Sequence, residues 1–174
     1  MGIQPRLIKR IRRKQGEKKK VTGNEIRKTI EIDASPEIVF KALTNIDELT
    51  QWFPDHVILE PKVGGKFKFS FYKDSKKSGS KAKEHRMDFF PEGKVLEFMP
   101  NKKVSYTWQH KAVPDFPETI VTWELEPIGK NKTRVKLTHS GFTGKEGDMY
   151  KEHNEGWSHY INELILYCKE KRNK

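Results

Sequence analysis

The chain lacks the features that stabilise small secreted proteins or place proteins in membranes. It has one cysteine, Cys168, so no disulfide can form within the chain, and this composition suits a reducing, cytoplasmic compartment. No apolar run approaches the roughly 20 residues that a membrane-spanning helix needs. The first 20 residues also lack the apolar stretch of a secretory signal. With 174 residues, the chain is long enough for one domain with its own hydrophobic core.

Motifs for metal binding and nucleophilic catalysis are missing as well. No group of cysteines and histidines has the spacing of a zinc site. Gly64-Gly65 stands alone and predicts a turn rather than a phosphate-binding loop. Cys168 has no basic side chain near it in the sequence that would activate it, and we interpret it as a small buried residue. We therefore predict no metal site, no bound cofactor and no dedicated set of catalytic residues.

Positive charge is concentrated at the N-terminus. The net charge is +11, but residues 1–20 contain nine basic residues and one acidic residue, whereas the remaining residues are nearly balanced. We predict that residues 1–23 form a basic, disordered tail, because they are too polar to bury much surface. The tail is either a solvated charge run or a weak contact for nucleic acid, ribosome or an anionic membrane surface. The candidate polyanion-binding residues are Lys9, Arg10, Arg12, Arg13, Lys14, Lys18, Lys19 and Lys20.

The domain is predicted to span residues 24–174 and to begin with a strand and two short helices. Residues 26–33 alternate between apolar and polar side chains, which is typical of a half-buried strand. Ser35 and Pro36 are a helix N-cap and a proline at the first helical position, so a short helix is expected to follow. A second short helix is expected over 47–53, ending before Pro54.

Antiparallel strands and a long helix are predicted for the rest. Period-two alternation marks strands around 66–71, 104–108, 121–125 and 134–139. We predict a hairpin between 86–91 and 94–99 with its turn at Glu92-Gly93. Apolar residues at three- and four-residue steps predict a helix from about Asp148 to Lys171. Gly156 inside this helix indicates either that another element approaches it closely, which we expect, or a tolerated defect in the helix.

Several stretches in this order resemble one known family. They are IEIDASPEIVFKALTN with Trp52 beyond it, VGGKFKF, EGKVLEFMPNKKVSYTW, VTWELEPIGKNKTRVKLTHSGF, and EGW at 155–157. Together they cover about residues 25–170. The set is similar to the branch of the START-like (SRPBCC) superfamily that is related to the C-terminal domain of the heat-shock-protein-90 ATPase activator.

The resemblance implies an α+β helix-grip fold, in which a curved antiparallel sheet wraps around a long C-terminal helix. It also implies a cavity between sheet and helix that could take an apolar small molecule, and a link to a chaperone partner and the stress response. The full eukaryotic activator carries a further N-terminal domain, for which this chain leaves no room. Because one fold hosts many functions, the function must come from the site itself.

The predicted interior is rich in aromatic side chains, which form either an ordinary core or the lining of an apolar ligand pocket. Tyr106, His139 and His153 could supply polar contacts in the same space. The complete set of cavity candidates is Trp52, Phe69, Phe71, Phe89, Tyr106, Trp108, Trp123, His139, His153, Trp157 and Ile161.

Two alternatives to a non-enzymatic binding domain remain open from the sequence. His139 follows Val135 and Leu137 on the face predicted to point inward. It either satisfies a hydrogen bond in the core or acts as the acid–base group of a small cyclase or lyase. In the second alternative, the basic tail docks an interaction protein onto a polyanion.

Overall fold

The computed structural model describes residues 24–74 and 88–174. Its described elements are β1 (Asn24–Ile32), α2 (Pro36–Thr44), α3 (Ile46–Trp52), β2 (His56–Leu59), β3 (Lys66–Ser70), β4 (Glu92–Met99), β5 (Lys103–Trp108), β6 (Thr119–Gly129), β7 (Lys132–Phe142) and α4 (Met149–Arg172). This order confirms the predicted α+β helix-grip fold. The tail assigned to residues 1–23 lies outside the described residues.

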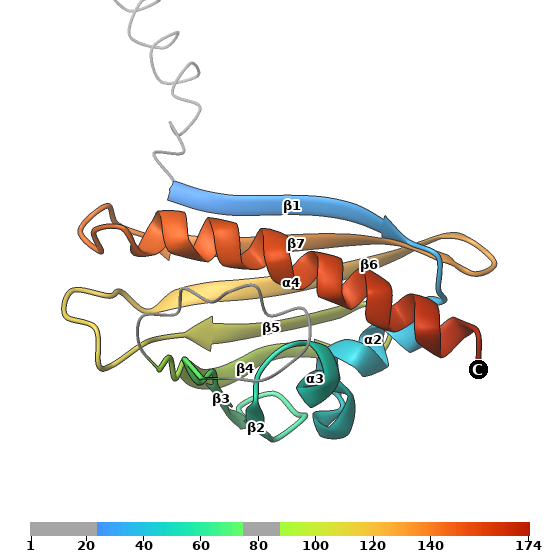
Figure 1. Cartoon of the computed structure of the whole chain (residues 1–174), viewed down its shortest axis with the longest axis horizontal. Coiled ribbons are helices and arrows are strands. Elements are labelled where there is room, and N and C mark those ends of the chain that lie inside the picture. The colour runs from blue at the N-terminus through green and yellow to red at the C-terminus, as the bar shows by residue number, and fades with distance from the viewer. Residues whose placement is uncertain (1–23, 75–87) are drawn as a thin grey trace, which may run out of the picture.

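Seven antiparallel strands form one curved sheet in the order β1-β7-β6-β5-β4-β3-β2. The first two strands are therefore at opposite edges, and α2 and α3 connect them. Figure 1 shows α4 lying across one face of the sheet, with α2 and α3 beside its C-terminal half. The core lies between the sheet and these three helices.

The two short helices begin where their capping residues predict. The Ser35 hydroxyl accepts a hydrogen bond from the Ile38 amide, and Pro36 occupies the first turn of α2. The Asn45 side chain accepts one from the Glu48 amide at the start of α3. Trp52 then links the two helices, because its indole Nε1 donates to the Ala42 carbonyl oxygen at 2.9 Å.

The hairpin predicted at Glu92-Gly93 is wrong. Both residues lie inside β4, where Gly93 pairs with Phe67 of β3. A Cβ atom on Gly93 would lie 2.3 Å from the Thr107 carbonyl oxygen, so glycine here permits a close approach of β5 rather than a turn. Phe89 forms an isolated bridge with Phe71, and residues 86 and 87 of the expected hairpin lie outside the described residues.

The terminal helix is amphipathic as predicted. His153, Trp157, Ile161, Leu164 and Cys168 are all buried on its inner face. Asp148 stands at the N-cap but its side chain makes no capping hydrogen bond. Within residues 24–74 and 88–174, every helix is too short or too polar to be a transmembrane segment.

The expected close approach at Gly156 is wrong, because no neighbouring atom lies within 4 Å of a Cβ built at this position. Gly156→Ala should therefore meet no steric obstacle. Since alanine has the higher helix propensity, we expect the free energy of unfolding to rise by about 1 kcal/mol. Chemical denaturation would measure this change. Gly93→Ala is the matched comparison and should destabilise the protein, and a stabilising Gly93→Ala would contradict the assigned strand packing.

Candidate functional site

The predicted cavity candidates come together on the inner face of the sheet and on α4, with Trp52 at the end of α3. Ten of the eleven are less than a tenth exposed, and Phe89 is partly buried. Phe69 of β3 contacts Tyr106 and Trp108 of β5, and Trp108 and Trp157 bring sheet and helix together at a ring-centroid distance of 5.6 Å. The sequence therefore identified which side chains point inward.

Two histidines and two tryptophans join α4 to the sheet by hydrogen bonds. Trp157 Nε1 donates to His139 Nδ1 at 2.9 Å, and the other nitrogen of His139, Nε2, lies 2.7 Å from Thr119 Oγ1. Trp108 Nε1 donates to His153 Nε2 at 3.2 Å. We call Trp108, Thr119, His139, His153 and Trp157 the Trp–His network.

The hydrogen-bond partners of the two histidines fix the tautomer of each ring. The Thr119 hydroxyl donates to the Trp108 carbonyl oxygen at 2.8 Å, so it accepts from His139 Nε2–H. His139 Nδ1 then carries no proton and accepts from Trp157. His153 Nδ1 lies 2.7 Å from the Met149 carbonyl oxygen and must donate to it, which leaves Nε2 to accept from Trp108. Both histidines are therefore neutral in this arrangement.

His139 is poorly placed for acid–base chemistry. Its ring is fully buried, and both nitrogens are hydrogen-bonded inside the protein. Burial holds the pKa of His139 well below its usual range, and the repulsion that a protonated His139 would meet from a protonated His153 lowers it further. A neutral ring with no free nitrogen fits the reading of a satisfied core histidine better than that of a proton-transfer group.

Tyr106 is also occupied within the core. Its hydroxyl accepts a hydrogen bond from Trp123 Nε1 at 3.1 Å, and burial raises its pKa. Trp52 likewise donates its indole N–H to the carbonyl oxygen of Ala42 on α2. The polar groups of Trp52, Tyr106 and the Trp–His network thus bond to other parts of the fold, whereas His110 Nε2 is buried without a hydrogen-bond partner among the described residues.

Several inward residues were missed by the sequence reasoning. Phe53 stacks on Trp52 at 4.9 Å and packs 5.5 Å from Trp157, although it stands at the end of a helix and follows no strand pattern. Thr119 opens β6 opposite Trp108, and only the strand register reveals its place in the network. His110 is buried against Phe89, and burial lowers its pKa.

No group of acidic, histidine or cysteine side chains within the described ranges could hold a metal ion. Cys168 is fully buried, and burial raises the pKa of its thiol to about 12. The thiol is thus protonated at neutral pH and is a weak nucleophile.

The family model for the activator of Hsp90 ATPase homolog 1-like protein matches residues 33–168. No curated protein matches the chain. The Aha1 dimer from Colwellia psychrerythraea is 28% identical with a TM-score of 0.61, over 81% of this chain and 92% of that chain.

Two further solved structures are similar. An Hsp90 activator from Plasmodium falciparum is 24% identical with a TM-score of 0.63, over 82% of this chain and 94% of that one. A protein from Mesorhizobium loti is 23% identical with a TM-score of 0.68, over 84% of this chain and 97% of that one. At this identity, these two support the fold alone.

Proposed function

Because the chain belongs to the family of activator of Hsp90 ATPase homolog 1-like proteins, we propose that it is a non-enzymatic START-like domain that binds an Hsp90-type chaperone. The family match carries the proposal, because it spans residues 33–168 and therefore all described elements except β1 and the last residues of α4. The Aha1 dimer named above, at 28% identity, supports the same assignment. The Trp–His network adds a physical argument. Since it uses the interior polar groups for packing, recognition falls to the surface of the domain.

The proposal predicts saturable binding of the full chain to the Hsp90-type chaperone of the same organism, together with a changed rate of ATP hydrolysis by the chaperone. Isothermal titration calorimetry measures the binding, and a coupled assay measures the hydrolysis. An inhibitor specific for the chaperone identifies contaminating ATPase activity. If neither a heat change nor a rate effect is seen at protein concentrations near 100 μM, a binding free energy more favourable than about −5 kcal/mol is excluded. That result would overturn the proposal.

An apolar small molecule in the interior is the second candidate, favoured by the aromatic side chains that line both sheet and helix. Such sites are usually apolar with a few placed polar groups. A ligand there would have to separate rings such as Trp108 and Trp157, whose centroids lie 5.6 Å apart. It would copurify with the protein, so native mass spectrometry distinguishes it from a chaperone partner.

The basic N-terminal tail is proposed to contribute a weak contact with polyanions. Residues 1–20 carry nine of the 35 basic residues, which are the groups that release counterions from a nucleic acid. Deleting residues 1–20 should abolish binding to duplex DNA at low salt and leave chaperone binding unchanged. Unchanged DNA binding in fluorescence anisotropy would place the contact on the folded domain.

A further inference from the structure

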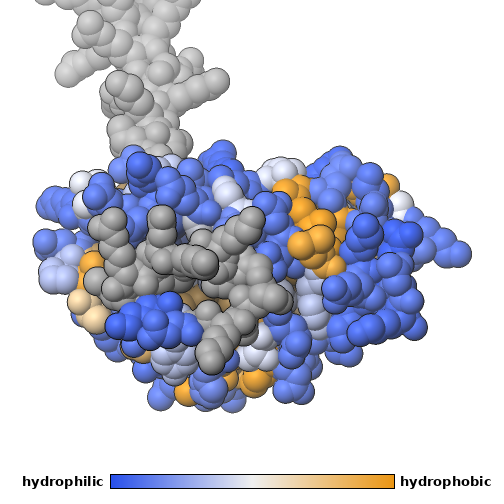
Figure 2. Space-filling view, viewed as in Figure 1, coloured by the Kyte–Doolittle hydropathy of each residue, from blue (hydrophilic) through white to orange (hydrophobic). Residues whose placement is uncertain are grey.

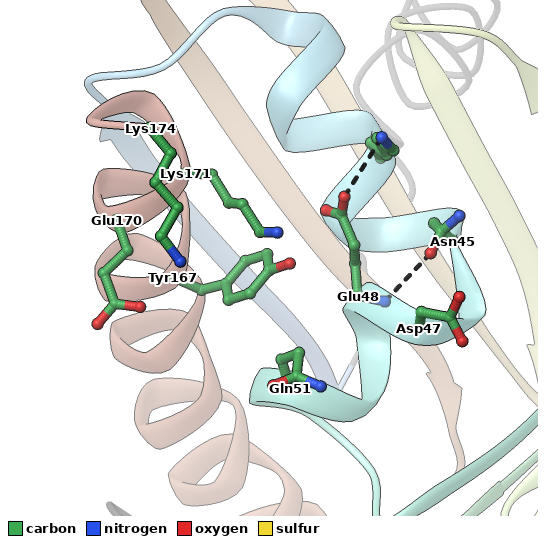
Figure 3. Close-up of a pocket in the computed structure, with 9 residues that line it drawn as sticks. Asn45, Asp47, Glu48, Gln51, Tyr167, Glu170, Lys171 and Lys174 are labelled. Atoms are coloured by element: carbon green, nitrogen blue, oxygen red, sulfur yellow. Dashed lines mark hydrogen bonds and ion pairs between the residues drawn. The ribbon is translucent and has the colours of Figure 1, made fainter.

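A polar pocket of about 490 Å³ lies where the C-terminal part of α4 meets α2 and α3. Figure 3 shows the Tyr167 ring extending from α4 towards Glu48 on α3, with Lys171 and Lys174 on the α4 side. The pocket lies away from the Trp–His network and shares none of its residues. A role for this pocket is therefore independent of the proposal that the chain binds a chaperone.

Tyr167 brings a buried hydroxyl into this pocket. Only 9% of the residue is exposed, and its hydroxyl faces the Glu48 carboxylate without a hydrogen bond of normal length within the described part of the chain. Most buried polar groups in native proteins are satisfied, because an unsatisfied one loses its hydration without compensation. A group bound between this hydroxyl and Glu48 would complete the hydrogen bonding of both.

Glu48 supplies a fixed negative charge beside this hydroxyl. Its side chain is 12% exposed, and its ion pair with Lys41 spans 3.7 Å, which is longer than a hydrogen bond. Burial and the charge of Glu48 raise the pKa of Tyr167, and the same charge contributes to the raised pKa of Cys168. The wall of the pocket is therefore negative and retains unused acceptor capacity.

The positive side chains of the pocket are held less firmly. The Lys41 side chain is 63% exposed, Lys171 is exposed on the last turn of α4, and Lys174 is exposed just beyond it. The Lys171 ammonium lies over the Tyr167 ring at 5.4 Å from its centroid. Exposed lysines are screened by solvent and can move away, whereas the largely buried side chains of Glu48 and Tyr167 are held in place. These two side chains therefore decide the charge of the ligand.

We propose that this pocket binds an organic cation whose guanidinium or ammonium group donates hydrogen bonds to the Glu48 carboxylate and the Tyr167 hydroxyl. A guanidinium fits both acceptors, because its planar set of N–H donors can pair with a carboxylate and reach a neighbouring oxygen. The C-terminal end of α4 adds partial negative charge, which also favours a cation, whereas the end of α2 adjoins the start of α3 at Asn45 and their partial charges offset each other.

An NMR titration of the full 174-residue chain tests this site. The probe is N-acetyl-arginine methylamide, and N-acetyl-citrulline methylamide is its uncharged counterpart. We expect the arginine probe to shift amide resonances of residues 45–51 and 167–171, and the citrulline probe to leave them unchanged. Equal shifts with both probes, or shifts confined to other parts of the domain, would overturn the proposal.

Three variants separate the contributions of the pocket residues. Glu48→Gln should weaken binding about tenfold or more, because a charge-assisted hydrogen bond is lost. Tyr167→Phe should weaken binding by a smaller factor without lowering the unfolding midpoint, since it removes an unsatisfied hydroxyl. Glu155→Gln, at an exposed position of α4 outside the pocket, is the matched control and should bind normally. Undiminished binding by both Glu48→Gln and Tyr167→Phe contradicts the site.

The same titration distinguishes two sources of the cation. A free amino acid carries a carboxylate that Lys171 or Lys174 could bind, so free arginine should then bind more tightly than the blocked probe. If the natural ligand is a side chain of a partner protein, the blocked probe should bind at least as tightly as free arginine.

Discussion

Replacing Trp157 with alanine is expected to lower the free energy of unfolding by about 3–5 kcal/mol, the range for removing a buried aromatic side chain. Trp157 is 3% exposed and packs against Trp108 and Trp123. The substitution also leaves His139 Nδ1 without its donor, which adds the cost of an unsatisfied buried acceptor. Urea denaturation at neutral pH measures the change.

Two further variants separate the causes of the lower free energy of unfolding in Trp157→Ala. Trp157→Phe keeps an aromatic ring but removes the N–H, so it should cost less than alanine while still disturbing His139. Ser158→Ala, at the next and exposed position of α4, is the control and should change stability by less than about 0.5 kcal/mol. A Trp157→Ala protein as stable as the Ser158→Ala protein would contradict the assigned inner face of α4.

Lowering the pH should destabilise the domain already at pH values well above those at which carboxylates take up protons. His139 is neutral in the fold with its pKa held well below 6.5, whereas in the unfolded chain it takes up a proton below about pH 6.5. The unfolded state therefore binds more protons as the pH falls, and stability decreases by up to about 1.4 kcal/mol per pH unit. Between pH 6.5 and 5 the expected loss is at most about 1.7 kcal/mol. At pH values well above 6.5 this contribution is constant.

The His139 contribution is separated by substitution. His139→Gln removes the titrating ring. The free energy of unfolding should therefore fall less between pH 6.5 and 5 than in the parent, by the amount linked to the uptake of one proton. His110, whose pKa is also lowered by burial, should account for part of the remainder. His56→Gln, on the exposed position of edge strand β2, serves as the control. A pH dependence that His139→Gln leaves unchanged would rule out a buried neutral His139.

Regular patterns in the sequence predicted most of the fold. The alternation of Phe67, Phe69 and Phe71 correctly marked the inner face of β3 and of the residue after it, and Ser35 and Pro36 placed the start of α2. The predicted start of the second helix at residue 47 is one residue from the observed start of α3. These features are local, because side-chain direction follows from periods of two and of about 3.6 residues. The Glu92-Gly93 prediction failed because glycine is equally at home in a turn and in a strand that must approach its neighbour closely.

The contacts within the core could not be predicted in the same way. The strand pattern correctly predicted that His139 points inward. Its hydrogen bonds to Thr119 and Trp157, however, depend on the strand register and on the rotation of α4 over the sheet. The pocket at Tyr167 likewise arises from the packing of three helices that are distant in the chain. Figure 2 shows hydrophilic side chains over most of the described atoms visible on the face that carries α4, with a hydrophobic area right of centre and smaller ones along the left and lower rim.

The central claim is that the aromatic interior is a hydrogen-bonded core and that recognition takes place on the surface. Native mass spectrometry of the full chain, purified gently from cells, tests this claim most directly. The account predicts the mass of the bare 20.5 kDa chain. A discrete adduct of a few hundred daltons that is released on unfolding, and is absent after Trp157→Ala, would contradict it and establish an interior ligand site.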